Sequence, residues 1–134
     1  MRIDTQAQRV IWSASDLKAA AECEFAWARA IDAKLGRVPA VEEPEDATLK
    51  RAAELGDVHE QNVLDRYIHD LGDENVHRIE KVSSVDAEAL AAAVDETVAA
   101  LRSDALVVFQ AAFATDEFVG FADFLRKDDE GRWR

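Results

Sequence analysis

The sequence predicts an α+β fold with three helices and an incomplete mixed β-sheet, and two observations carry this prediction. Up to about residue 103, apolar residues recur every three or four positions between capping residues and glycines, which is typical of amphipathic helices. After that point the period falls to about two, and β-branched and aromatic residues become frequent. The 134 residues are enough for a single domain, 1–134, with a helical part at 1–72 and a third helix and β-hairpin at 73–134.

The first predicted helix covers residues 13–35. Ser13 and Asp16 form a capping-box pattern at its start, and Gly36 provides the stop. Cys23 lies among the apolar positions, so we expect it to be a small core residue. The series that should face the core is Leu17, Ala21, Phe25, Ala28, Ile31 and Leu35.

Two more helices are expected further along the chain. The second starts after Asp46 and runs to Leu71, where Gly72 ends it. The third spans residues 85–103 behind another capping-box pattern, formed by Ser83 and Asp86. The apolar stripe predicted for the third helix is Leu90, Val94, Val98 and Leu101.

Strands are predicted between and after these helices. The segment NVHRIE, residues 75–80, favours a short strand, and residues 105–113 and 118–125 favour a β-hairpin around a turn at 115–117. A second turn at 128–131 precedes the first step of another strand at 132–134. Because a strand that begins there leaves hydrogen-bonding edges unpaired, we expect the polypeptide to be a fragment or to be completed by another chain.

Charge and cysteine content exclude several classes of function. The formal net charge is −12, and most of it lies within residues 41–100. This charge argues against general nucleic-acid binding, because binding to phosphates requires clustered Lys and Arg. A single cysteine excludes an intramolecular disulfide and Cys-rich zinc or iron–sulfur sites within this chain. The sequence contains neither an apolar run of membrane-spanning length nor a secretory signal. We therefore expect a cytoplasmic protein with no membrane partner.

Glu60 is the first candidate for chemistry. On a helical wheel it falls inside the apolar stripe of the second helix, whereas four polar neighbours fall on the other side, namely Glu54, Asp57, Gln61 and Asp65. Burying an ionised carboxylate costs on the order of several kcal/mol unless it is paired, protonated or bound to a cation. Taken alone, such a residue is more often a boundary or ion-pair residue, and His59 on the flank of the stripe is more often a surface histidine than a ligand.

Asp123 is the second candidate. Val119, Phe121 and Leu125 share its face of the predicted strand and apolar residues occupy the other face, so the strand should be buried on both sides around this single acid. Taken alone, Asp123 fits an exposed strand edge equally well. Together with Glu60 it predicts a site for Mg²⁺ or Mn²⁺, since these hard cations take oxygen ligands.

Three motifs, in this order, resemble those of the RecB-like branch of the PD-(D/E)XK nucleases. Residues 12–36, WSASDLKAAAECEFAWARAIDAKLG, are similar to the entry helix of these domains. LGDVHEQNVLDRY at 55–67 resembles their first motif, a glycine followed by a His or Glu on a helix, and GFADFL at 120–125 resembles their second motif, G-h-h-D on a core strand. The likeness covers residues 12–125 and is nearest to bacterial domains that are fused to a helicase.

The resemblance implies a truncated restriction-endonuclease-like core in which Asp123 and Glu60, with or without His59, bind catalytic Mg²⁺ or Mn²⁺. It also implies DNA as the substrate of the complete protein and a helicase domain acting in cis or in trans. The step from Gly56 to His59 is one residue shorter than in many members of the family, which leaves His59 and Glu60 as alternatives for the first-motif ligand.

The third motif of the family, an acid-x-Lys pair on the next strand, does not follow the turn at 128–131 within the 134 residues. Lys127 lies in the turn itself and is a poor substitute for that lysine. Because the missing pair would supply a further metal ligand and a cation beside the nucleophile, we expect this polypeptide to be inactive alone and to bind metal weakly.

Two other functions stay open on the sequence. The chain could be a non-catalytic acidic module that binds a partner protein through its acidic helical face or an open sheet edge. An acidic DNA mimic would need a regular exposed array of charge, for which residues 41–100 are the candidate segment. The nuclease hypothesis predicts that the carboxylates of Glu60 and Asp123 approach each other, whereas the module hypothesis predicts that they face different surfaces.

Overall fold

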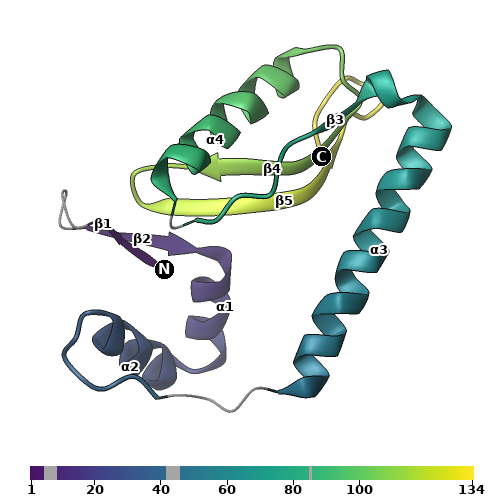
Figure 1. Cartoon of the computed structure of the whole chain (residues 1–134). Coiled ribbons are helices and arrows are strands. Elements are labelled where there is room, and N and C mark those ends of the chain that lie inside the picture. Colours follow the sequence, from purple (N-terminus) through teal and green to yellow (C-terminus); the bar gives the residue numbers. More distant parts are fainter. Residues whose placement is uncertain (5–8, 42–45, 85) are drawn as a thin grey trace.

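A computed structural model describes residues 1–4, 9–41, 46–84 and 86–134 as a mixed α/β fold (Figure 1). The helices of the described residues are α1 (Ala14–Glu22), α2 (Glu24–Lys34), α3 (Ala47–Leu71) and α4 (Ala87–Arg102), with a short 3₁₀ helix, η1 (Asp73–Asn75). The strands are β1 (Arg2–Asp4), β2 (Arg9–Ser13), β3 (Val76–Arg78), β4 (Val107–Ala114) and β5 (Phe118–Arg126). Helices and strands are thus both present as predicted, but the expected three helices are four.

The strands form one curled, mixed sheet in the order β1-β2-β5-β4-β3. β1 pairs with β2 and β4 pairs with β5 in antiparallel fashion, whereas β2 with β5 and β3 with β4 are parallel pairs. The predicted short strand and hairpin correspond to β3, β4 and β5. The part of the chain that was expected to be helical, 1–72, also holds β1 and β2, whose three and five residues are too short to show a clear period.

The predicted first helix is two helices, with the break at Cys23. The backbone of Cys23 is extended, with φ −159° and ψ 101°, and its thiol accepts a hydrogen bond from the Ala26 N–H at 3.5 Å. Cys23 is therefore the N-cap of α2, and because its side chain is exposed, the expectation of a core cysteine is wrong. The predicted end signals hold, since the Ser13 N–H donates to Asp16 and Gly36 has a φ of 70°.

α3 begins and ends where the sequence predicts. The Asp46 carboxylate accepts a hydrogen bond from the Thr48 N–H at 2.8 Å, and Gly72, with a φ of 89°, follows the last helical residue. Although α3 has 25 residues, no helix in the described ranges is long and apolar enough to cross a membrane.

α4 ends close to the predicted residue but starts later than expected. Its N-cap is Asp86, whose carboxylate accepts a hydrogen bond from the Ala89 N–H at 3.0 Å, so Ser83 is not the cap. Residue 85, the predicted first residue of this helix, lies outside the described residues.

The apolar stripe predicted for α4 meets the core except at Val98, because Leu90 is buried and Val94 and Leu101 pack against the same cluster. The buried residues of α4 are Leu90, Ala93, Thr97 and Ala100, whereas Val98 is 38% exposed. Thr97 is buried beside this stripe, and its Oγ1 donates to the Ala93 carbonyl at 2.8 Å and accepts from the Ala112 N–H of β4 at 2.9 Å. A buried hydroxyl and a buried amide both require such partners.

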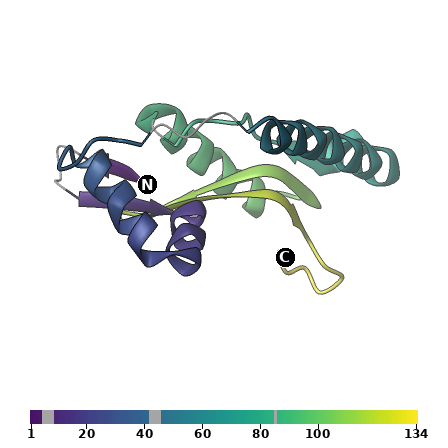
Figure 2. The ribbon, with the colours of Figure 1, turned by 90° about the horizontal axis from the view of Figure 1, so that it is seen from below.

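The buried core consists of two clusters. The first joins α4 to β2, β4 and β5 and includes Leu90 and Val108. The second joins α3 to β3, β4 and β5 through residues such as Leu64 and Val107, with Phe109 packed against it. Figure 2 shows that the β4–β5 hairpin, which contributes to both clusters, bends along its length.

Two helical faces are exposed in the described residues. In α1 and α2, Leu17 and Phe25 belong to the series that was expected to face the core, yet they are 59% and 76% exposed. α2 meets the sheet instead through Trp27, whose ring centroid lies 5.4 Å from that of Trp12 in β2. Every residue of α3 from 47 to 59 is also exposed, and Figure 1 shows this end of α3 reaching away from the sheet.

The turn predicted at 128–131 is present and is held by Asp128. Its carboxylate accepts hydrogen bonds from the N–H groups of Glu130 and Arg132, at 3.0 and 2.8 Å. Arg126 and Arg134 then exchange two backbone hydrogen bonds at 2.8 and 2.9 Å. The predicted first step of a strand beyond this turn is therefore confirmed.

Candidate functional site

Glu60 lies on the side of α3 that meets the sheet. It is partly buried, whereas its four polar neighbours are exposed, as the helical wheel predicts. His59 is exposed as well. Of the two alternatives for the first-motif position, the side chain turned toward the sheet is that of Glu60.

The partner of Glu60 is Gln110 in β4. The side-chain amide Nε2 of Gln110 donates to Oε2 of Glu60 at 3.0 Å and so links helix and strand across 50 positions of sequence. Gln110 itself is only 6% exposed. Because a carboxylate placed against the sheet needs hydrogen-bond partners, this contact offsets part of the cost of its burial. It occupies one of the two carboxylate oxygens.

Gln110 has an unusual backbone conformation. Its φ is 58°, and among the described residues it is the only non-glycine residue with a positive φ. The left-handed region costs an L-residue with a side chain about 1–2 kcal/mol. Strain of this kind persists where the surrounding structure requires it, and it is concentrated at functional sites. In this fold the strained residue is also the one that binds Glu60.

Asp123 lies opposite Gln110 in the hairpin. Phe109 pairs with Phe124 and Ala111 pairs with Ala122, so the register places Asp123 directly across from Gln110. Within β4 the regular pairing is interrupted at this one position. Gln110 therefore neighbours both candidate acids, one through a hydrogen bond and the other through the strand register.

Aromatic packing holds α3 against this part of the hairpin. Tyr67 lies two helical turns after Glu60, and its ring centroid is 5.5 Å from that of Phe124. The Phe109 ring is 5.0 Å from the same Phe124 ring. Each tilted aromatic pair contributes about 0.5–1.5 kcal/mol beyond the area it buries. Phe109 and Phe124 are the sequence neighbours of Gln110 and Asp123. This packing therefore holds α3 against the part of the hairpin that contains Gln110.

The surroundings of Asp123 differ from the expectation. Both Asp123 and Phe121 are exposed, Phe121 by 43%, so the prediction of a strand buried on both sides is wrong here. The reason is that β2 pairs with β5 only at Phe118 and Val119, while α4 packs against β4. The Asp123 side of the site is open to water.

Carboxylate oxygens are the ligands that a hard divalent cation prefers. Glu60 and Asp123 offer carboxylate oxygens, and Mg²⁺ is commonly bound through one or two carboxylates together with water and substrate phosphates. In the part of the chain that the structure describes, no group of three or more His, Cys, Asp and Glu side chains is placed to hold a metal ion. A cation site built from these residues would thus rest on two carboxylates and on water.

Lys127, the lysine nearest to the expected third motif, belongs to the C-terminal turn. Its Nζ donates to the Ser103 carbonyl at 3.2 Å and lies 4.8 Å above the ring of Trp133. A cation over an aromatic face is stabilised by the ring quadrupole. These contacts give Lys127 a structural role in the turn.

Comparison of the chain with protein-family models, curated proteins and solved structures finds no match. The geometry around Gln110 and the motifs in the sequence are therefore the features from which a function can be proposed. Gln110 was not among the residues that the sequence analysis singled out. The signal that could have found it is a lone polar residue inside the apolar strand segment ALVVFQAAF.

Proposed function

We propose that the chain is the N-terminal part of a metal-dependent DNA nuclease of the RecB-like PD-(D/E)XK type, in which Glu60 and Asp123 bind Mg²⁺ or Mn²⁺. The observation that carries this proposal is the hydrogen bond from Gln110 to Glu60, because Gln110 stands opposite Asp123 in the hairpin. Gln110 thus binds the acid of α3, and the register of the hairpin puts the acid of β5 across from it. The order of the three sequence motifs supports the same assignment.

The geometry also favours one of the two first-motif alternatives. Glu60 is partly buried and bonded to the hairpin, whereas the neighbouring His59 is exposed. We therefore propose Glu60 as the helical ligand, with His59 at most reaching the cation from the flank of α3.

The proposed roles follow from the chemistry of phosphodiester hydrolysis. When bound, a divalent cation would polarise a phosphate oxygen and lower the pKa of a coordinated water molecule. Glu60 and Asp123 would hold the cation from opposite elements, and Gln110 would keep Glu60 in place. The acid-x-Lys pair of the family does not follow the turn at 128–131 within the 134 residues and would come from outside them. The chain alone should therefore bind a cation weakly without cleaving DNA, and a helicase domain would act with the complete protein.

The test is a Mn²⁺ titration of the 134-residue chain, followed through paramagnetic broadening of its backbone amide signals by NMR. We expect the signals of residues 60, 110 and 123 to broaden first, and we expect Glu60→Gln and Asp123→Asn each to remove this selectivity. Asp65→Asn is the matched control, because Asp65 is an exposed acid on the same helix. Broadening that is uniform over the acidic surface, or that persists in both variants, would refute the proposal.

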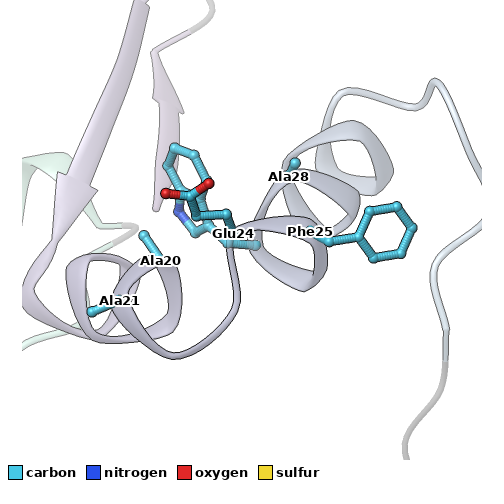
Figure 3. A pocket seen from close by; sticks show the side chains of 6 residues that line it. Ala20, Ala21, Glu24, Phe25 and Ala28 are labelled. Carbon is cyan, nitrogen blue, oxygen red and sulfur yellow. The ribbon is translucent and has the colours of Figure 1, made fainter.

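A non-catalytic interaction module is the second candidate function. It is favoured by the exposed apolar face of α1 and α2, where an open hollow is lined by Ala20, Ala21, Glu24, Phe25, Trp27 and Ala28. Figure 3 shows the Phe25 ring projecting from α2, away from α1. Exposed apolar surface of this kind commonly marks a protein-binding face. Because such a module needs no cation at Glu60, the Mn²⁺ titration separates the two functions.

A further inference from the structure

We infer that the outer edge of β5 over residues 120–125 is the acceptor for one further strand, which continues from Arg134 and runs antiparallel to β5. The outer edge is the side of β5 that faces away from β4. The inference rests on the part of the proposed function that makes the chain the N-terminal part of a longer protein, and it requires no cation. It goes further because it states where the next segment lies and how long a strand the sheet accepts there.

The outer edge of β5 is occupied at both ends but not between them. At one end β2 pairs with β5 at Phe118 and Val119. At the other end Arg126 and Arg134 exchange two backbone hydrogen bonds at 2.8 and 2.9 Å. Among the described residues, none pairs with the outer edge of 120–125, whereas β4 covers the inner edge. The sheet therefore has a gap that is about six residues, or about 20 Å, long.

The gap lacks most of the features that protect exposed strand edges. Soluble proteins usually keep such edges very short or place lysines, prolines or bulges on them. β5 instead has nine residues, and the stretch 120–125 contains Phe121, Phe124 and a single charged residue, Asp123. Phe121 is 43% exposed. An edge of this length and composition would invite non-native pairing unless another strand covers it.

Trp133 and Arg134 already lie on this edge and run in the direction of the gap. Lys127 and Trp133 form an antiparallel bridge, and the Trp133 Nε1–H donates to the Leu101 carbonyl at 3.0 Å. The Trp133 side chain also packs against the first core cluster. These contacts fix the position and direction of the segment. A strand that continues from Arg134 without turning therefore passes along residues 120–125, beginning at their C-terminal end.

The two ends of the gap distinguish between the possible occupants. A second copy of the chain would lay its own β5 along the edge, and a strand of nine residues would collide with Arg134 at one end and with β2 at the other. A strand of a separate partner meets the same limits and also loses translational and rotational freedom on binding. A strand that continues from Arg134 avoids both costs, because the turn at 128–131 has already closed the loop.

Strand addition would change the surroundings of Asp123. It would give β5 a neighbour on both sides at this position, and a residue of the added strand would lie beside Asp123. Paired residues of neighbouring strands share one face of a sheet, so their side chains interact. The added strand would also cover the exposed Phe121. Because β2 occupies the edge at Val119, the added strand should turn away after about six residues.

The experiment joins a strand-forming extension of about six alternating threonine and valine residues to Arg134 of the full chain. The matched control carries the same extension with prolines at alternate positions, because proline cannot donate to a strand ladder. Amide hydrogen exchange and NOE contacts are measured by NMR without metal. Some amides of residues 120–125 should exchange rapidly in the unextended chain and about tenfold more slowly with the threonine–valine extension. NOE contacts should join that extension to β5 in antiparallel order, and the proline control should show neither effect.

Rapid exchange of residues 120–125 in both extended chains would overturn the inference. Pairing that displaces β2 would also overturn it, and would appear as faster exchange of the Trp12 amide, which donates to the Glu117 carbonyl at 2.8 Å.

Two further measurements test the other occupants. Equal protection of residues 120–125 by the free threonine–valine peptide would assign the edge to a separate partner. Protection that rises with the concentration of the unextended chain would assign it to a second copy. Either result would contradict the inference. The Mn²⁺ titration is independent of these measurements, so loss of the proposed cation site would leave strand addition standing, and the reverse also holds.

Discussion

The side-chain amide of Gln110 in β4 donates to the carboxylate of Glu60 in α3 at 3.0 Å, and this bond connects the long helix to the hairpin. It is made by a residue with a strained backbone, at the one point where the pairing of β4 with β5 is interrupted. Asp123 occupies the opposite position in that interruption. The helix and the strained strand residue are therefore joined at the level of Asp123, and each of these features can be tested separately.

The backbone strain at Gln110 can be measured with two truncations. Gln110→Gly and Gln110→Ala both remove the amide, but glycine adopts a φ of 58° freely, whereas alanine does not. We expect the glycine variant to be more stable than the alanine variant by about 1 kcal/mol in urea unfolding.

Ala111 provides the control for this comparison, because its φ is not positive. Ala111→Gly should lower the free energy of unfolding by about 0.5–1 kcal/mol. Alanine should therefore be the more stable residue at position 111, whereas glycine should be the more stable one at position 110. The left-handed conformation of Gln110 would be disproved if alanine were the better residue at both positions.

Replacement of Thr97 tests the contact between α4 and the sheet. Thr97→Val keeps the shape of the side chain but leaves the Ala112 N–H without its acceptor, which should destabilise the fold by about 1–3 kcal/mol. The specific readout is hydrogen exchange of the Ala112 amide, which should accelerate in Thr97→Val and stay protected in Thr97→Ser. Equal protection in the two variants would show that the hydroxyl is not the partner of this amide.

The C-terminal turn should respond to acid through Asp128. The hydrogen bond from the Arg132 N–H, with further bonds from the guanidinium groups of Arg134 and Arg132, holds the pKa of the Asp128 carboxyl below its ordinary value of 3.8. Because the folded pKa is the lower one, the stabilisation is present above the unfolded pKa and is lost as the pH falls through the folded value. NMR titration of the Arg132 amide should give a midpoint below 3.8 that is absent in Asp128→Asn. A midpoint at or above 3.8 would contradict this role of Asp128.

Nuclease activity should require residues beyond the proposed cation ligands. We expect the 134-residue chain to leave DNA intact, and a longer polypeptide that continues into a strand with an acid-x-Lys pair to cleave it with Mg²⁺ or Mn²⁺. Glu60→Gln or Asp123→Asn in that longer polypeptide should reduce cleavage to background, whereas Asp65→Asn should not. Inertness of the longer polypeptide on both single- and double-stranded DNA with either metal would count against the nuclease assignment.

The features that the sequence predicts correctly are those that act over a few residues. Asp46 and Gly72 delimit α3 because a capping carboxylate and a left-handed glycine work within one turn. The inward placement of Glu60 follows from the helical period of the same segment. The break at Cys23 escapes this reasoning, because cysteine is not one of the residues that usually cap a helix.

The features that sequence alone misses depend on partners far along the chain. The burial of the polar Thr97 depends on its bond with Ala112, and the exposure of Asp123 follows from where β2 stops pairing with β5. Two features mark Gln110, its strained backbone and its bond to a carboxylate 50 positions away, and neither can be recognised from the sequence. Periodicity places single residues on faces of elements, but it carries no information about which faces meet.

Anomalous diffraction from crystals of the chain grown with Mn²⁺ tests the central claim most directly. We predict one manganese peak that is bound by carboxylate oxygens of both Glu60 and Asp123. A peak held by other acids, or Glu60 and Asp123 carboxylates that share no ion, would contradict the claim.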